Sequence, residues 1–222
     1  MELLRLLQGA ETIGHDDGMV RRLLVNDLPQ KISHICVIFN DQDRGTSWTL
    51  SGWWNQRESD TPACAGAANL GALAGKLAEL AEAGFNWAVI DTPPAIGATN
   101  RLAIAAADLV VIPTRASPHD LNALGSTLEI VQEAGKPFVF VLNSAKPGTA
   151  IATQAVALLS DHGPVCPTVI GDRVMYASSM SDGRSIAELD PSGKGALELD
   201  ELLEFVKSRF PEFKKVKVKQ YA

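Results

Sequence analysis

The sequence predicts an α/β fold: a doubly wound, mainly parallel sheet with helices on both faces. Three short apolar runs carry this prediction, at Trp87–Ile90, Leu109–Pro113 and Phe138–Asn143. Each has the length and composition of a strand that is buried on both faces, as parallel strands are. Stretches of helical character separate the runs, and strands that alternate with helices indicate parallel β–α–β units.

The first of these runs ends at Asp91, which is followed by Thr92, Pro93 and Pro94. The two prolines cannot continue a hydrogen-bonded ladder, so the chain leaves the sheet there. An acid in this position lies at the carboxyl end of a parallel strand, where open α/β sheets bind ligands. An acid that merely begins a turn fits the same residues, and the short pattern alone leaves both interpretations open.

Periodicity and turn residues predict the rest of the fold. Further strands are expected at Met1–Leu7, His34–Asn40 and Val165–Ile170. Helices are expected from Asp16 to about Leu28 and at Ala65–Ala83, Asn100–Ala107, Asp120–Glu133, Ala150–Ser160, Gly171–Met180 and Lys194–Phe210. In the second of these helices, one face carries Leu70, Leu73, Leu77 and Leu80. Trp53 and Trp54 are expected to be packing residues rather than a platform for stacking bases.

Length and charge predict one domain, residues 1–210, followed by a basic tail, residues 211–222. The chain has 222 residues and a formal net charge of −6. Between Lys207 and Lys219 there are six basic residues and one acid, which leaves an acidic body. A basic tail on an acidic body can bind DNA phosphates, or it can be a solvated chain end. The candidates for DNA contact are Lys214, Lys215, Lys217 and Lys219, and their stretch alternates with period two, as a strand or an extended arm does.

The cysteines and histidines give no sign of a metal centre. Cys36, Cys64 and Cys166 are far apart and form no C-x-x-C pair, which fits a reduced, cytoplasmic setting without zinc or an iron–sulfur cluster. The four histidines, His15, His34, His119 and His162, lack ligand spacing and a serine partner. No apolar stretch reaches the roughly 18 residues that a membrane span requires.

Four segments together resemble the ParA/MinD family of P-loop ATPases, most of all the small ParA partition proteins. They are V-I-D-T-P-P, A-A-A-D-L-V-V-I-P-T, F-V-F-V-L-N and E-L-D-P-S-G-K-G-A, and the resemblance covers residues 85–210 well and 33–62 in part. The resemblance implies a P-loop NTPase-like fold, ATP and magnesium as ligands, dimers, and a role in plasmid or chromosome partition. It also implies a cytoplasmic protein that associates with the nucleoid or a plasmid.

The chain departs from this family at the phosphate-binding loop, whose pattern is K-G-G-x-x-K-[ST]. Gly9 and Gly14 remain, but His15 stands in place of the essential lysine and Asp16 in place of the hydroxyl residue. A carboxylate repels phosphate by roughly 1 kcal/mol at 4 Å in water, and by more in a drier site. We therefore expect a vestigial loop, in which Asp16 and its neighbour cap a helix instead.

Other residues match functional positions of the family. Asp41, Asp43 and Asp91 match the acids that hold magnesium and position water, and carboxylates are ligands that hard cations prefer. Pro113 and Asn143 match positions beside the adenine base. Without a phosphate cradle we expect these residues to be vestigial, with no catalytic residue, no bound metal and no cofactor.

Three functional hypotheses follow. In the first, the chain is a non-catalytic ParA-like protein that acts in partition or DNA transfer by binding a partner protein or DNA. The alternative is an ATPase of the ParA type with an aberrant phosphate loop, to which Arg44 or Arg115 supplies the missing cation. In the third, the chain is a regulatory subunit that pairs with a complete ParA ATPase. The expected partners are a partition or conjugation factor, a complete ParA ATPase, weakly bound nonspecific DNA, or a second copy of the chain.

Overall fold

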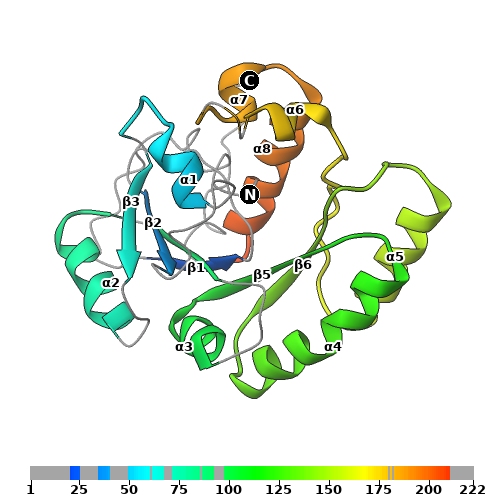
Figure 1. Cartoon of the computed structure of the whole chain (residues 1–222). Helices are drawn as coiled ribbons and strands as arrows, with labels where there is room; N and C mark the ends of the chain where they lie inside the picture. The colour runs from blue at the N-terminus through cyan, green and yellow to red at the C-terminus, as the bar shows by residue number, and fades with distance from the viewer. Residues whose placement is uncertain are drawn as a thin grey trace, which may run out of the picture.

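The computed structural model describes residues 21–25, 35–40, 50–60, 62–67, 72–85, 87–92, 98–179, 181 and 183–210. Within this part of the chain, six strands form one sheet in which every pairing is parallel (Figure 1). The strands are β1 (Arg21–Val25), β2 (Ile35–Asn40), β3 (Ala63–Ala67), β4 (Trp87–Asp91), β5 (Leu109–Thr114) and β6 (Phe138–Leu142), in the spatial order β3-β2-β4-β1-β5-β6. The predicted fold class is confirmed.

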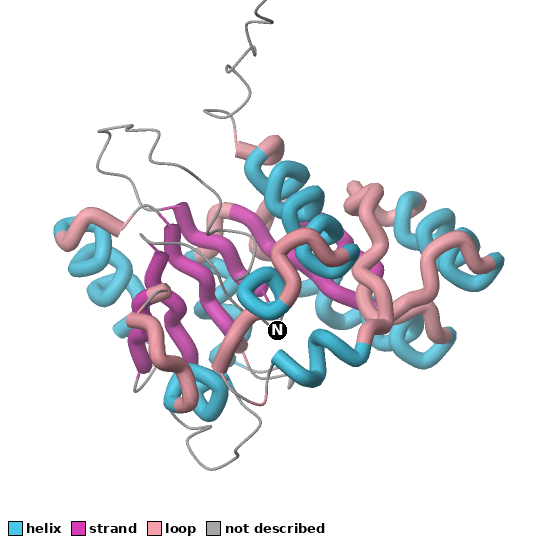
Figure 2. Tube along the Cα trace, turned by 90° about the horizontal axis from the view of Figure 1, so that it is seen from above, coloured by secondary structure: helices cyan, strands magenta, loops and turns pink. Residues whose placement is uncertain are grey.

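Helices cover both faces of the sheet (Figure 2). They are α1 (Leu50–Asn55), α2 (Leu73–Glu82), α3 (Ala98–Ala106), α4 (Pro118–Glu133), α5 (Ala150–Ser160), α6 (Val174–Ser179), α7 (Ile186–Leu189) and α8 (Lys194–Lys207). Buried side chains of α1, α7 and α8 join one apolar cluster, and those of α2 to α5 join a second cluster. Consecutive residues of β4 point into the two clusters in turn, Trp87 and Val89 into the first and Ala88 and Ile90 into the second.

The strongest sequence signals are confirmed. The three apolar runs are β4, β5 and β6, and the residues from Trp87 to Ile90 are at most 5% exposed. The helix predicted at Ala150–Ser160 is α5, with the predicted bounds. Ser117 caps α4, since its Oγ accepts a hydrogen bond from the Asp120 backbone N–H at 3.2 Å. Trp53 is a packing residue, only 1% exposed, and Trp54 packs against the same cluster.

The helix predicted at Ala65–Ala83 is wrong in its first part. Ala63–Ala67 is strand β3, which pairs with β2 along its length, and α2 begins only at Leu73. The alanines of this segment favour a helix in isolation, but pairing along β2 outweighs that small preference. The leucine face was predicted correctly, because Leu73, Leu77 and Leu80 are buried, while Leu70 lies outside the described residues.

Two further predictions need correction. The helix predicted to run to about Leu28 is wrong, because Arg21–Val25 is strand β1, paired with β4 on one side and β5 on the other. The first strand predicted at Met1–Leu7 lies outside the described residues. Val165–Ile170 lies beside β6 but forms no regular strand. It makes an isolated bridge at Phe140 and Val165, and the Cys166 and Ile170 N–H groups donate to the Phe140 and Leu142 carbonyls, while Pro167 has no N–H for a continuous ladder.

The helix predicted at Gly171–Met180 is the shorter α6, and the chain then makes a further short helix, α7, that the sequence had not indicated. Ser185 begins α7 with a capping box: its Oγ accepts from the Glu188 N–H at 3.1 Å, and the Glu188 carboxylate accepts from the Ser185 N–H at 2.6 Å. None of the helices in the described ranges is long and apolar enough to cross a membrane.

Candidate functional site

Polar residues gather where three neighbouring parallel strands end. β4 ends at Asp91 and is followed by Thr92, β5 ends at Thr114, and Asn143 follows β6. Thr92 and Thr114 are buried, at 7% and 6% exposure, while Asp91 and Asn143 are half-buried. Because the carboxyl ends of parallel strands meet at one edge of a sheet, these residues form a polar rim there. The structure therefore places Asp91 and Asn143 at the carboxyl edge of the sheet, and their roles toward a metal or a nucleotide stay predictions.

Hydrogen bonds to β5 and to the following residue fix the position of Asn143. Its N–H donates to the Thr114 carbonyl at 2.7 Å, and its Oδ1 accepts from the Ser144 N–H at 2.8 Å. Ser144 has a φ of 48°, in the left-handed region that residues with a side chain seldom adopt. Pro113 lies in β5, one residue before the strand ends, and pairs with Val141 of β6. Backbone hydrogen bonds and the left-handed conformation of Ser144 thus fix the position of Asn143 beside the end of β5.

The acids expected to converge at this rim are described only in part. Asp91 pairs in register with Phe39, so the end of β2 lies beside it. Asp41 and Asp43 follow β2 but lie outside the described residues. In the ranges that the structure does describe, no three histidine, cysteine, aspartate or glutamate side chains come together as metal ligands would. The described part of the rim carries one carboxylate, that of Asp91, beside the buried side chains of Thr92 and Thr114.

Two groups of predicted site residues fall outside the described part of the chain. The first is the vestigial loop, Gly9, Gly14, His15 and Asp16, and the second is the set of candidate DNA-binding lysines, Lys214, Lys215, Lys217 and Lys219. Of the two candidate arginines, Arg44 also lies outside it, whereas Arg115 is exposed directly after β5. Arg115 is therefore a basic residue that directly follows a residue of the rim, Thr114.

A buried arginine that sequence reasoning missed, two residues after the end of α1, is bound to α7 and to the chain segment just before it. Arg57, with only 2% of its side chain exposed, donates from Nη1 to the Gly183 carbonyl at 2.8 Å. Its guanidinium also makes a two-bond ion pair with Glu188, at 3.0 and 2.7 Å, and lies 5.2 Å from the Trp53 ring centroid. Burial raises the pKa of Glu188, but hydrogen bonds from Arg57 and Ser185 outweigh it and lower the pKa from 4.5 to about 2.

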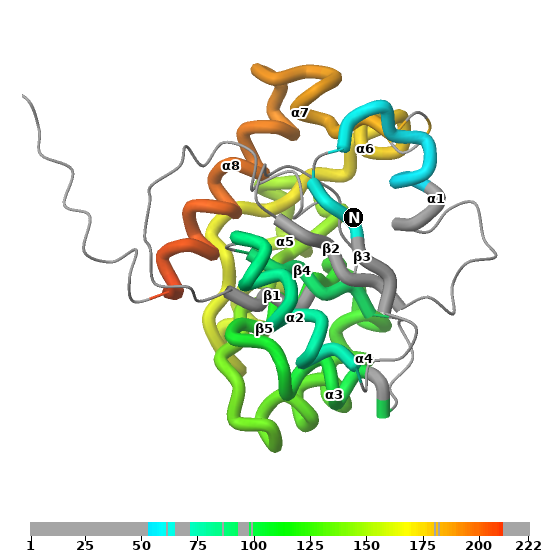
Figure 3. Tube along the Cα trace, turned by 90° about the vertical axis from the view of Figure 1, so that its left-hand side faces the viewer, coloured from blue at the N-terminus to red at the C-terminus, as the bar shows by residue number. Residues whose placement is uncertain are grey.

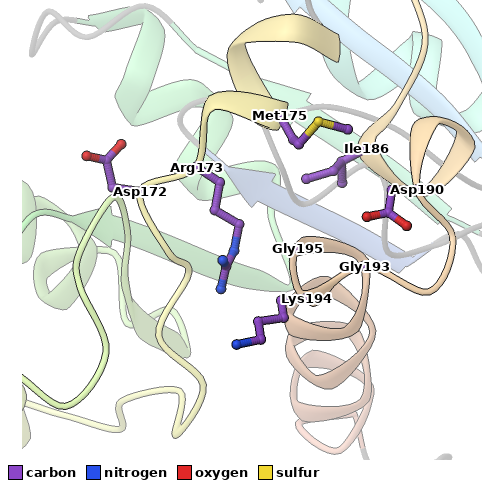
Figure 4. Close-up of a pocket in the computed structure, with 8 residues that line it drawn as sticks. All are labelled: Asp172, Arg173, Met175, Ile186, Asp190, Gly193, Lys194 and Gly195. Atoms are coloured by element: carbon purple, nitrogen blue, oxygen red, sulfur yellow. The ribbon is translucent and has the colours of Figure 1, made fainter.

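A cavity of about 360 Å³ opens between α6, α7 and the start of α8 (Figure 4). It is lined by Asp172, Arg173, Met175, Ile186, Asp190, Gly193, Lys194 and Gly195. Arg173 is engaged by Glu198, whose Oε2 accepts from the arginine Nε at 3.0 Å. Gly195 packs closely against the wall of the cavity, because a Cβ there would come within 2.3 Å of Ile186 Cδ1. The lining carries both signs of charge, so the cavity has no clear preference for an anion or a cation.

Comparison with known proteins finds sequence similarity to proteins of cell division and chromosome partitioning. No protein-family model matches it. The cell division protein PomZ of Myxococcus xanthus is 30% identical over 137 residues, which cover 58% of this chain and 43% of that protein. The chromosome-partitioning ATPase Soj of Thermus thermophilus is 33% identical over 153 residues, covering 63% of this chain and 61% of that protein. The matches therefore span less than two thirds of the length of these relatives.

The fold agrees with the same group. The septum site-determining protein MinD of Pyrococcus horikoshii, solved with Mg-ADP, superposes with a TM-score of 0.66 over 89% of this chain and 100% of that chain. The sequence identity of that pair is 15%, so this likeness concerns the fold.

Proposed function

We propose that this chain, which is a homologue of the ParA/MinD-family ATPases and shares their fold, acts in partition or positioning without hydrolysing ATP itself. It would keep the fold and its partner-binding surfaces and act through a protein partner or through DNA. The partner would be a partition or conjugation factor or a complete ParA ATPase. The other possible partner is a second copy of the chain, with which it would form a homodimer.

The chain around β1 is the observation that carries this proposal. β1 holds the central place in the sheet, between β4 and β5. In a P-loop protein, a glycine-rich loop with a lysine follows such a strand and leads directly into a helix. Here nine residues, Asn26 to His34, lie between β1 and β2, and none of them is a glycine.

The length of this connection supports the same conclusion. β1 and β2 are parallel and separated by β4, and a crossover between parallel strands usually takes a dozen or more residues when it carries a helix. Nine residues are fewer than such a crossover usually takes. The glycines before β1, Gly9 and Gly14, have no lysine near them, because the first lysine of the chain is Lys31. Both features argue against a working ATP cradle.

ATP turnover tests the proposal directly. The purified chain, with magnesium and with or without duplex DNA, should release no phosphate above a buffer blank. An intact P-loop ATPase assayed beside it shows that the conditions support hydrolysis. Steady turnover by the chain that follows its concentration would overturn the proposal and favour the alternative ATPase.

Replacing Asp91 should cost little and remove no activity. An acid that only begins a turn contributes about 0.5–2 kcal/mol, so Asp91→Ala should lower the free energy of unfolding by that amount. The alternative ATPase gives a different result, because Asp91→Ala and Arg115→Ala would then each reduce phosphate release. Urea unfolding and the turnover assay on the two variants distinguish these outcomes.

We also propose that the basic tail binds duplex DNA without sequence preference and without ATP. Four lysine–phosphate contacts predict a slope of about −3.6 for log affinity against log salt, at −0.9 per contact. A shift of duplex DNA should therefore appear at low salt, vanish at high salt and be unaffected by ATP.

Matched lysine substitutions test this proposal. Lys217→Gln with Lys219→Gln should weaken DNA binding and reduce the slope by about 2. The control is Lys136→Gln with Lys146→Gln, which changes the charge equally at two lysines outside the tail and should leave the slope unchanged. ATP-stimulated or sequence-specific binding, or equal effects of the two pairs, would contradict the proposal.

A further inference from the structure

We propose that the outer face of α5 joins two copies of this chain, with the two α5 helices packed antiparallel about a two-fold axis. α5 lies beside β6 at the end of the sheet, and its buried residues Ala152, Ala155 and Leu159 belong to the second apolar cluster (Figure 1). The side of α5 turned away from this cluster is exposed. The second copy is the homodimer partner named in the proposed function, on which this inference rests.

The exposed side of α5 is apolar and uncharged. Ile151 and Leu158 are 54% and 55% exposed, and their spacing of seven residues places them two turns apart on one side of the helix. No residue of α5 carries a charge. Charged residues are depleted at the centre of protein interfaces, whereas ordinary surface helices carry them. The surface helix α8, for comparison, exposes Lys194, Asp200, Glu201 and Glu204. The composition of α5 therefore indicates a face that another protein surface covers.

Charges of opposite sign flank this face and select the partner. Lys146 lies four residues before the start of α5, Asp161 directly follows its end, and both are exposed. In an antiparallel pair of α5 helices, Lys146 of each copy comes near Asp161 of the other copy. A parallel pair would bring like charges together and would also align the two helix dipoles unfavourably. The face is thus complementary in charge to itself, as a two-fold contact requires.

The exposed residues also define the register of the pair. Ile151 and Leu158 are equally far from the point between residues 154 and 155, so a two-fold axis there brings Ile151 of one copy against Leu158 of the other. Gln154 is exposed on the same side, three residues after Ile151, and lies next to this axis. Its amide both donates and accepts, so the two copies of Gln154 are able to bond each other. Exposed Ala150 and Ala157 beside the stripe let the helices approach closely.

The size of the contact determines the expected affinity. α5 has 11 residues and is about 16 Å long at 1.5 Å per residue. One pair of such helices buries less than the roughly 1,200–2,000 Å² of a standard stable interface. We therefore expect a reversible dimer with micromolar affinity, which sedimentation equilibrium of the full chain without nucleotide detects as a mass that rises with concentration.

Complementary charged variants test the contact and its register. Ile151→Lys and Leu158→Glu should each weaken self-association at least about tenfold, because each buries an unpaired charge at the contact. An equal mixture of the two variants should dimerise again, since the new lysine of one copy then faces the new glutamate of the other. Both natural side chains are more than half exposed, so neither substitution disturbs the core.

Leu197→Glu is the matched control. Leu197 is 52% exposed on α8, which packs on the opposite face of the sheet from α3, α4 and α5 (Figure 3). This variant gains the same charge as Leu158→Glu at a similarly exposed leucine, and it should leave self-association unchanged.

An engineered disulfide gives a second readout in the folded dimer. Gln154→Cys places a thiol beside the axis, so mild oxidation should join two chains through it. Thr153→Cys is the control, because Thr153 is exposed but lies about 100° around the helix from Gln154. The natural chain, which keeps its own cysteines, gives the background.

Three results would overturn the proposal: a natural chain that stays monomeric at every concentration, equal losses from Leu158→Glu and Leu197→Glu, or a mixture of the charged variants that stays monomeric. The first would leave the face of α5 to a different protein. These measurements contain no ATP, so a monomeric chain would leave the proposed absence of hydrolysis untouched. Conversely, turnover of ATP by a chain that dimerises through α5 would overturn the proposed function alone.

Discussion

Arg57→Ala should be among the most destabilising single substitutions in the described structure. It removes both bonds to Glu188, the bond to the Gly183 carbonyl and the contact with the Trp53 ring. Glu188 would then remain partly buried, at 26% exposure, without its cation. Removing one partner of such a pair costs about 3 kcal/mol. Urea unfolding followed by tryptophan fluorescence measures this loss as a fall in the midpoint.

Arg101→Ala is the matched control, because Arg101 and Glu133 make an exposed ion pair with side-chain exposures of 57% and 65%. Exposed pairs contribute about 0–1 kcal/mol, so this midpoint should hardly move. Equal losses for the two variants would show that the bonds from Arg57 to Gly183 and Glu188 do not stabilise the fold.

Acid should remove the stability that the ion pair between Arg57 and Glu188 contributes to the fold. The pKa of Glu188 is lowered from 4.5 to about 2 in the folded chain, so the carboxylate contributes stability that is complete above pH 4.5. That contribution is lost as the pH falls from 4.5 toward 2. The difference in unfolding free energy between wild type and Arg57→Ala should therefore be constant from pH 7 to about 5 and shrink below that. A difference that stays constant down to pH 2 would contradict the ion-pair account.

Gly183→Ala should destabilise the fold by a similar amount. Gly183 has a φ of 73°, where a residue with a side chain is strained by roughly 1–2 kcal/mol. A Cβ at this position would also come within 2.6 Å of the Arg57 backbone N and Cα, and overpacking of this kind costs about 1–3 kcal/mol. We therefore expect a loss of about 3 kcal/mol in the free energy of unfolding, measured by urea titration.

Gly135→Ala separates the two causes. Gly135 has a similar φ of 63°, but nothing lies within 4 Å of a Cβ built there. This variant should lose only the conformational part, roughly 1–2 kcal/mol. If the two glycine variants lose the same amount, the close approach between Gly183 and the backbone of Arg57 carries no cost.

The sequence was most informative where a strand is buried on both faces. A short, continuous apolar run such as L-V-V-I-P is typical of a parallel strand that is buried on both faces. For this reason β4, β5 and β6 were predicted correctly. β3 was missed because its small residues A-C-A-G-A carry no strand pattern, and only the neighbouring β2 makes them a strand. β1 was missed because R-R-L-L-V continued a helical pattern from the acids before it.

The candidate site was predictable to the same extent as its strands. The positions of Asp91 and Asn143 at the carboxyl ends of β4 and β6 followed from the strand predictions, because a residue at the end of a parallel strand lies at that edge of the sheet. The link between Arg57 and Glu188 was not predictable, since 131 residues separate its partners and neither has a pattern around it. The cavity at the start of α8 was missed for the same reason, because α6, α7 and α8 bring its lining together only in the fold.

Equilibrium dialysis of radiolabelled ATP with magnesium tests the central claim most directly. The account predicts no saturable binding to the wild-type chain, and no gain from His15→Lys combined with Asp16→Thr, because Gly9 and Gly14 alone leave too few flexible positions for a phosphate loop. An intact P-loop ATPase dialysed in parallel provides the positive control. Saturable binding of ATP by the wild-type chain, at one nucleotide per chain and with micromolar affinity, would contradict the account.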